Sequence, residues 1–153
     1  MAERILVAYA SKAGATKTVA EAMGQELGRE GASVDVVSVQ DVKDMRGYDA
    51  VVVGSGIRAG NVYGDAVKFL SAHSAVLAGK PVAYFIVCAT MQAPTDENRR
   101  TVMGYVDHWK KRVPQIEPID VGLFAGAIDY GKIGLIPRTV LKLMKVGEGD
   151  WRD

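Results

Sequence analysis

The sequence has little of what marks several classes of protein. It contains one cysteine, Cys88, among its 153 residues. This excludes an intramolecular disulfide and any zinc or iron–sulfur site built from cysteines. Its two histidines, His73 and His108, lack the spacing of metal ligands, and we expect both to lie on helices as surface or packing residues. The longest apolar stretches are about seven residues, far short of the ~20 that cross a bilayer.

The charge also lacks a bias of one sign. There are 19 Lys and Arg against 18 Asp and Glu, a net charge of +1, so we expect no nucleic-acid partner. The N-terminus places Glu3 and Arg4 before a short apolar run, which is not the order of a signal peptide. With 48% hydrophobic residues, the chain is expected to form one cytoplasmic domain over residues 1–153.

Short apolar runs alternate with amphipathic segments along the chain. The runs cover residues 5–9, 34–39, 50–53, 82–87 and 119–125. They are rich in β-branched residues and mostly continuous, a pattern typical of parallel strands buried on both faces.

Three helices are predicted between these strands, at residues 16–31, 66–77 and 95–113. In the first, Val19, Met23 and Leu27 recur every four residues, and Gly31 is placed as a helix stop. Thr95 has the side chain of an N-cap for the third.

The order of elements predicts a doubly wound α/β sandwich with a five-stranded parallel sheet. Residues 40–49 are too few for a packed crossover helix, so we expect a loop there. This favours the strand order 2-1-3-4-5, in which ligands bind beyond the carboxyl ends of the strands. The loops at that edge are residues 10–16, 54–62, 88–95 and 126–132.

The first of these loops reads Ser11-Lys12-Ala13-Gly14-Ala15-Thr16. Two hydroxyls, a turn glycine and the free N–H groups of a helix start can hold an anion of phosphate size. The spacing of a P-loop is missing, which argues against triphosphate hydrolysis. An ordinary N-cap threonine with a turn glycine would give the same pattern, so both interpretations remain open.

The second loop, residues 54–61, contains Gly-x-Gly-x-x-Ala. The match to a dinucleotide fingerprint is a false positive, because it follows the third strand and no strand ending in an acidic residue lies about 20 positions on. Its glycines suit either a backbone that approaches a planar ligand or a flexible surface turn. The third loop, residues 88–94, has no nucleophile constellation, and Cys88 is expected to be a small buried residue at a strand end. We therefore assign no catalytic residue and no metal site. If the protein is an enzyme, a cofactor performs the chemistry.

Residues 11–16 resemble the flavodoxin signature Thr/Ser-x-Thr-Gly-x-Thr, with Ala13 in place of the central hydroxyl. The sequence is also similar to the flavodoxin-domain family that contains menaquinone-dependent protoporphyrinogen IX dehydrogenases. This similarity rests on residues 11–16, 48–49, 54–58, 125–130, 141–145 and 147–150.

The resemblance implies a flavodoxin-like three-layer sandwich that binds FMN noncovalently. The FMN phosphate would be bound by Ser11, Lys12, Ala13, Gly14, Ala15 and Thr16. The isoalloxazine ring would lie between Ser55, Gly56, Ile57 and Arg58 on one side and Ala89, Thr90, Met91 and Gln92 on the other. The segment from Gly126 to Tyr130 would close one edge. Ile57 and Met91 stand where acidic flavodoxins usually place aromatic residues.

The resemblance implies two alternative functions. The first is hydrogen transfer from protoporphyrinogen IX, or a similar reduced substrate, to a quinone, a step of heme biosynthesis. The alternative is a single-domain electron-transfer protein that exchanges electrons with redox proteins and has no substrate of its own. An FMN-dependent NAD(P)H:quinone reductase has less support, because no nicotinamide-binding segment is recognisable.

Residues 132–146 combine four basic residues with apolar ones and contain no acid, which predicts a basic amphipathic helix. It would either cover the sheet or meet anionic lipid at the inner face of the membrane, a quinone or a tetrapyrrole carboxylate. Relatives normally continue into a final helix, which this sequence would lack because it ends at Asp153. We expect residues 132–146 or a second copy in a homo-oligomer to cover the space, unless the sequence is truncated.

Overall fold

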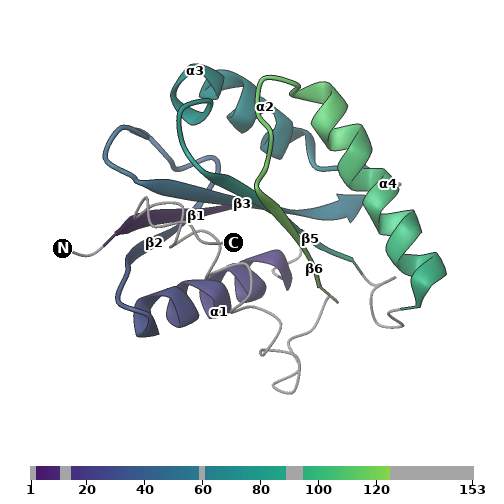
Figure 1. Cartoon of the computed structure of the whole chain (residues 1–153), viewed down its shortest axis with the longest axis horizontal. Coiled ribbons are helices and arrows are strands. Elements are labelled where there is room, and N and C mark those ends of the chain that lie inside the picture. Colours follow the sequence, from purple (N-terminus) through teal and green to yellow (C-terminus); the bar gives the residue numbers. More distant parts are fainter. Residues whose placement is uncertain (1–2, 11–14, 59–60, 89–94, 125–153) are drawn as a thin grey trace.

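The computed structural model describes residues 3–10, 15–58, 61–88 and 95–124. In chain order the elements are β1 (Arg4–Ala10), α1 (Ala15–Arg29), β2 (Ser33–Ser38), β3 (Ala50–Arg58), β4 (Asn61–Val62), α2 (Gly64–Ala72), α3 (Ser74–Leu77), β5 (Val82–Val87), α4 (Asp96–Arg112) and β6 (Asp120–Phe124). Figure 1 shows three layers, with α1 on one face of the sheet and α2, α3 and α4 on the other.

The sheet has the order β2-β1-β3-β5-β6, and these five strands are parallel. Counting only the five long strands, this is the predicted order 2-1-3-4-5, which is confirmed. The two-residue strand β4 pairs antiparallel with the end of β3. Strand β1 lies between β2 and β3. The chain reverses its direction of winding between β1 and β3, and such a switch point is where open α/β sheets bind ligands.

The sheet separates two apolar layers, because alternate side chains of each strand point to opposite faces. Ile5 and Val7 of β1 pack with α1, whereas Leu6 and Ala8 pack on the opposite side. All four are fully buried. Burial on both faces explains why the strands are continuous apolar runs in the sequence.

The helix ends follow the predicted signals. The Thr95 hydroxyl accepts a hydrogen bond from the Asn98 amide at 3.1 Å and so caps α4. Helix α1 ends at Arg29, two residues before Gly31, whose φ of 100° lies in the region that favours glycine. Both helices are therefore where the sequence placed them.

Two predicted elements differ from the structure. The helix predicted at residues 66–77 is two helices, α2 and α3, which meet at His73. The loop predicted at residues 54–62 was wrong in its first half, because β3 continues to Arg58 and forms a hairpin with β4. The predicted helix at residues 132–146 and the predicted lack of a final helix fall outside the described residues.

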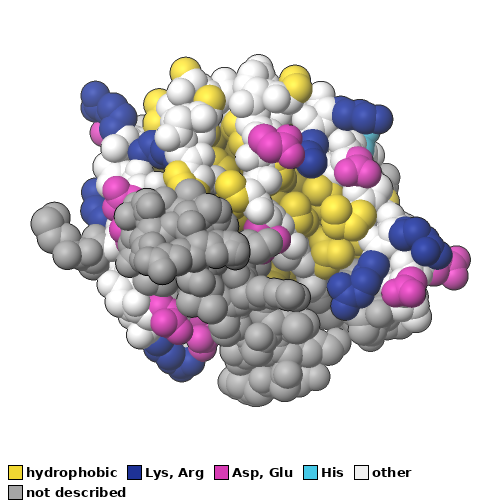
Figure 2. Space-filling view, in the orientation of Figure 1, with side chains coloured by type: hydrophobic (Ala, Val, Ile, Leu, Met, Phe, Trp, Pro, Cys, Tyr) yellow, Lys and Arg dark blue, Asp and Glu magenta, His cyan; other side chains and the backbone are white. Residues whose placement is uncertain are grey.

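The outer strand β6 is only half covered. All five of its residues are partly exposed, and its Val121 and Leu123 pack against the core on the side of α4. Met103 of α4 is 37% exposed. Figure 2 shows apolar side chains gathered on this face of the molecule, with charged side chains around them.

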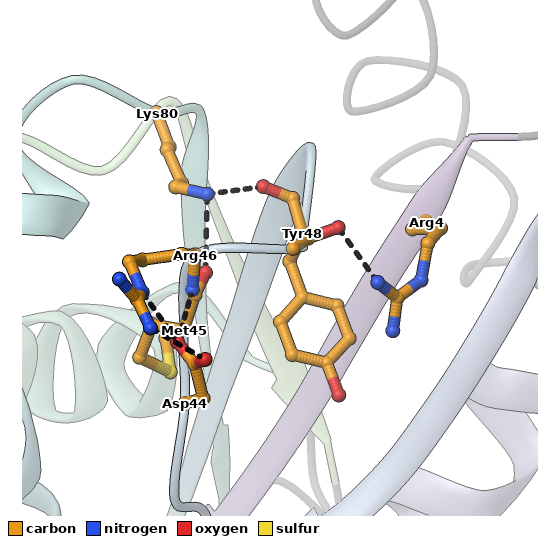
Figure 3. Close-up of polar contacts among 7 residues, drawn as sticks. Arg4, Asp44, Met45, Arg46, Tyr48 and Lys80 are labelled. Atoms are coloured by element: carbon orange, nitrogen blue, oxygen red, sulfur yellow. Dashed lines mark hydrogen bonds and ion pairs between the residues drawn. The ribbon is translucent and has the colours of Figure 1, made fainter.

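The segment between β2 and β3 contains no helix, as predicted, and polar contacts hold it at the amino-terminal edge of the sheet (Figure 3). The Lys80 ammonium donates to the carbonyls of Met45, at 3.1 Å, and Tyr48. The Arg4 guanidinium donates to the Gly47 carbonyl at 3.1 Å. In this segment, side chains of Lys80 and Arg4 thus satisfy backbone carbonyl groups that a crossover helix would satisfy with its own N–H groups.

Candidate functional site

The carboxyl ends of three strands and the start of α1 meet at one edge of the sheet. Ser55 of β3 aligns with Ala10 of β1 on one side and with Ile86 of β5 on the other. Helix α1 begins at Ala15, five residues after β1 ends. Residues that are far apart in the sequence are therefore brought together where the motifs predicted a ligand.

Thr16 is the described residue that best fits a binding role. It lies in the first turn of α1 and is only 2% exposed. Among the described residues, its hydroxyl has no hydrogen-bond partner. The first N–H groups of a helix also lack intrahelical partners and favour a negative charge. A buried free hydroxyl beside these groups is a donor set suited to a phosphate.

Gly56 brings β3 close to Thr16. A Cβ atom at Gly56 would lie 3.3 Å from the Thr16 Oγ1 atom and 3.3 Å from the Tyr63 ring. This is tighter than most side-chain contacts, so a larger residue would push the helix start and the strand end apart. Packing at this edge therefore requires a glycine at position 56.

Ser55 holds the hairpin at this edge. It is fully buried, its hydroxyl donates to the Gly56 carbonyl at 2.7 Å, and the same oxygen accepts the Tyr63 amide at 3.0 Å. These bonds join β3 to the residue that precedes α2. The Ser55 hydroxyl therefore positions the backbone, and its contact with a flavin stays a prediction.

Tyr63 was not singled out from the sequence. Its side chain is half-buried, with its hydroxyl oxygen 3.5 Å from the position of a Cβ at Gly56. It follows the glycine-rich residues 54–61, whose motif is the stronger signal in this part of the sequence. The available signal was an aromatic residue directly before a helix at the carboxyl edge of the sheet.

A second contact fixes the start of α2. The Gln40 side-chain amide donates to the Asp65 carboxylate at 2.8 Å. Gln40 follows β2, and Asp65 lies in the first turn of α2, where a negative charge is favourable. The chain after β2 is thereby tied to the helix that follows Tyr63.

The other predicted site residues are described only in part. Ile57 is half-buried and packs against the core on the α4 side. Arg58 ends β3, and Ala15 begins α1. Outside the described residues lie Ser11, Lys12, Ala13, Gly14, Ala89, Thr90, Met91, Gln92, Gly126 and Tyr130. Cys88 lies directly after β5, at a strand end as predicted, but it is half-buried rather than buried; its amide donates to the Phe124 carbonyl at 2.9 Å.

Several shifted pKa values belong to groups away from this edge. Burial raises the pKa of Tyr48, and so does the 2.6 Å hydrogen bond that its hydroxyl donates to the Asp35 carboxylate. The Arg46 side chain and amide donate to Asp44 and hold the pKa of that carboxyl below its usual value. Both pairs belong to the opposite, amino-terminal part of the sheet and have a structural role.

Two kinds of site are missing from the part of the chain that the structure describes. No group of three or more His, Cys, Asp or Glu side chains there could hold a metal ion. No helix in those same residues is both long and apolar enough to cross a membrane.

A doubly wound parallel sheet whose five long strands have the order 2-1-3-4-5 is the architecture of the flavodoxin-like class. The match to a family model is more specific. Residues 6–153 match the family described as "Flavodoxin domain", and the chain belongs to this family.

The relatives agree with this assignment. A protoporphyrinogen IX dehydrogenase [quinone] of Leishmania major is 28% identical over 151 residues, which are 96% of this chain and 64% of that protein. The protein of the same name from Escherichia coli K12 is 27% identical over 154 residues, covering 97% of this chain and 84% of that one. This chain therefore spans less than two thirds of the Leishmania protein.

A solved structure shows the same fold. A short-chain flavodoxin associated with a bacterial microcompartment superimposes with a TM-score of 0.75 at 15% identity, over 95% of this chain and 99% of that one. The flavodoxin-like fold predicted from the sequence is thus confirmed. The family and fold support an FMN oxidoreductase or a flavodoxin-type role.

The family implies a flavin cofactor, usually FMN, and the described residues fit one. Thr16 is a buried residue in the first turn of α1, the helix start favours an anion, and Gly56 lets the strand end approach the Thr16 hydroxyl. These groups match the phosphate end of FMN.

Proposed function

We propose that this protein is an FMN-dependent oxidoreductase that takes hydrogen from protoporphyrinogen IX, or a closely similar reduced substrate, and delivers it to a quinone. The observation that carries the proposal is the buried contact between Thr16 and Gly56 at the carboxyl edge, which suits a phosphate-bearing cofactor. The substrate is inferred from relatives that are named for this reaction and match nearly the whole chain.

The protein's part is to bind and orient the cofactor. Thr16 and the first N–H groups of α1 bind the phosphate, and Ser11 to Gly14 complete this loop. FMN, when bound, supplies the electron transfer. Residues 55–58 and 89–92 form the two sides of the ring site, where Arg58 and backbone N–H groups tune its electronic properties. Residues 126–130 close one edge.

A second candidate function is supported by the structural similarity to flavodoxins. In this role the protein carries electrons between redox proteins without a small-molecule substrate. The two candidates share the cofactor and the fold, so cofactor binding alone does not separate them. They differ in whether a porphyrinogen or a protein supplies the electrons.

The first experiment tests cofactor binding. Protein incubated with FMN and then desalted should retain flavin absorbance, and a protein that retains none would contradict both candidates. Replacing Thr16 with Ala should weaken FMN binding by about ten- to a hundredfold, the worth of a hydrogen bond to a charged group. Thr101→Ala is the control, because Thr101 is an exposed threonine of α4 and should leave the affinity unchanged.

The second experiment separates the two functions. FMN-loaded protein is assayed for oxidation of protoporphyrinogen IX with a menaquinone analogue, and in parallel for electron exchange with a ferredoxin reductase. Activity in the first assay supports the dehydrogenase. A protein that leaves the porphyrinogen unoxidised but exchanges electrons with the reductase is a carrier instead.

A further inference from the structure

We propose that the Tyr63 hydroxyl is a second neutral donor for the phosphate of the bound flavin, beside the hydroxyl of Thr16. The inference rests on the proposed FMN site and adds a residue from outside the predicted phosphate loop. It assigns to the segment before α2 a role in selecting a phosphorylated flavin over an unphosphorylated one.

The first step of the argument is position. Thr16 Oγ1 and the Tyr63 hydroxyl oxygen lie 3.3 and 3.5 Å from the same point, the place of a Cβ at Gly56. At most the sum of these two distances separates the two oxygens, a span that the oxygens of one phosphate group can bridge. Because Gly56 has no side chain, nothing from that residue stands between them.

The second step is that both hydroxyls are available. Among the described residues, neither the Thr16 nor the Tyr63 hydroxyl has a hydrogen-bond partner. Thr16 is 2% exposed and Tyr63 is half-buried. Polar groups with so little access to water normally find a partner, and two of them converging on a helix start point to an anionic ligand.

The third step is that the backbone around Tyr63 is fixed. Its amide donates to the buried Ser55 hydroxyl at 3.0 Å, and its carbonyl accepts the Ala66 amide at 3.0 Å. The Gln40 side chain holds Asp65 at 2.8 Å. A side chain on such a support loses little further freedom when a ligand binds, so its hydrogen bond contributes more to affinity.

The fourth step explains why the ligand is a phosphate rather than the flavin ring. The ring of Tyr63 and the Thr16 hydroxyl both approach the same side of Gly56, so the Tyr63 hydroxyl lies on the side of the edge where α1 begins. A phenol donates to an anionic oxygen more strongly than to a neutral one. The contribution of Tyr63 should therefore depend on the charge at the end of the ligand.

The test compares FMN with riboflavin, which lacks only the phosphate. Dissociation constants are measured by flavin fluorescence for wild type and Tyr63→Phe, which keeps the ring and loses the hydroxyl. We expect Tyr63→Phe to weaken FMN binding by about ten- to a hundredfold and to leave riboflavin binding unchanged. The phosphorus NMR resonance of bound FMN should shift in the same variant.

A matched control removes a hydroxyl elsewhere. Tyr105 is a half-buried tyrosine of α4, and Tyr105→Phe should change neither affinity. Thermal unfolding of the flavin-free proteins shows whether Tyr63→Phe remains folded, and the Thr16→Ala variant provides the reference for loss of one phosphate donor.

The outcomes separate this inference from the proposed function. If the wild type binds neither flavin, the proposed cofactor itself is wrong. If the wild type binds FMN and Tyr63→Phe binds it equally well, the FMN site stands and the role of Tyr63 is overturned. An equal loss for FMN and riboflavin would also overturn it, because the hydroxyl would then act on a part that the two ligands share.

Discussion

The ring of Phe85 on β5 occupies the space that a side chain at Gly54 on the neighbouring strand β3 would need. A Cβ atom built on Gly54 would overlap three atoms of the ring. Phe85 is 1% exposed and meets Phe124 of β6 edge to face, with ring centroids 6.1 Å apart. The ring thus links three adjacent strands on the face that α1 covers.

Replacing Gly54 with Ala should destabilise the protein by about 3 kcal/mol or more, because the added methyl group has no space in a close-packed layer. Urea denaturation followed by circular dichroism measures the change. The double variant Gly54→Ala with Phe85→Leu should recover part of the loss, since the smaller side chain leaves room.

Gly104 is the control for Gly54, because here we expect the same substitution to stabilise the protein. It lies in α4, and nothing is within 4 Å of a Cβ at that position. Gly104→Ala should stabilise the protein by about 0.5–1 kcal/mol, because glycine is a poor residue in a helix interior. If Gly54→Ala were as well tolerated as Gly104→Ala, the packing role of Gly54 would be wrong.

Tyr84 and Trp109 stack in the opposite layer, with ring centroids 4.2 Å apart and an interplanar angle of 17°. Among the described residues, the Tyr84 hydroxyl and the Trp109 ring nitrogen are both buried without a hydrogen-bond partner. We expect Tyr84→Phe to raise the free energy of unfolding by about 1 kcal/mol, since it removes an unsatisfied polar atom and keeps the ring. A loss of stability would show that the hydroxyl has a partner, such as a buried water.

The same variant should change the response to alkali. Burial raises the pKa of Tyr84 above its ordinary value of 10.0, and the charge of Glu117 adds to the rise. Above that ordinary value the unfolded chain loses the Tyr84 proton and the folded protein keeps it, so stability falls as the pH rises. Tyr84→Phe should reduce this fall, measured as urea midpoints at neutral pH and above pH 10. The control Tyr105→Phe should not reduce it to the same extent.

Lys80 supports the chain between β2 and β3, where its ammonium donates to the carbonyls of Met45 and Tyr48. Lys80→Met keeps the aliphatic stem and leaves both carbonyls without this donor. It should cost about 1–3 kcal/mol and speed hydrogen exchange of amides in residues 45–49. Lys43→Met changes an exposed lysine of the same segment and should have little effect. Equal effects of the two changes would contradict the structural role of Lys80.

Sequence patterns predicted the sheet well because burial on both faces leaves a direct mark. Three of the five predicted strands differ from the structure by one residue at each end, and the strand at residues 82–87 matches it. The third predicted strand, residues 50–53, continues in the structure through Gly54 to Arg58. That extension was missed because glycines indicate turns. At Gly54 the glycine instead makes room for a ring from the next strand, a contact that no local pattern reveals.

Candidate site residues could be selected from the sequence where a local pattern marks them, and were missed where their position depends on tertiary contacts. Thr16 could be selected from its place at a helix start, and it is buried there. Tyr63 could not, because its relation to Thr16 depends on a hairpin held by the Ser55 hydroxyl. The Ser55 hydroxyl organises the backbone of this hairpin, and its predicted contact with the ligand stays a prediction.

Thr95 and Thr101, near the start of α4, should respond differently to replacement by alanine. The Thr95 hydroxyl accepts the Asn98 amide at 3.1 Å, whereas the Thr101 hydroxyl donates to the Glu97 carbonyl at 3.1 Å within the helix. The first satisfies an amide of the first helical turn, where N–H groups lack intrahelical carbonyl partners, and the second bonds a carbonyl in the body of the helix. Thr95→Ala should therefore cost about 1 kcal/mol, and Thr101→Ala should be neutral or slightly stabilising, because alanine is the better helix former. Urea midpoints of the two variants measure the difference, and a larger loss for Thr101→Ala would contradict the capping role of Thr95.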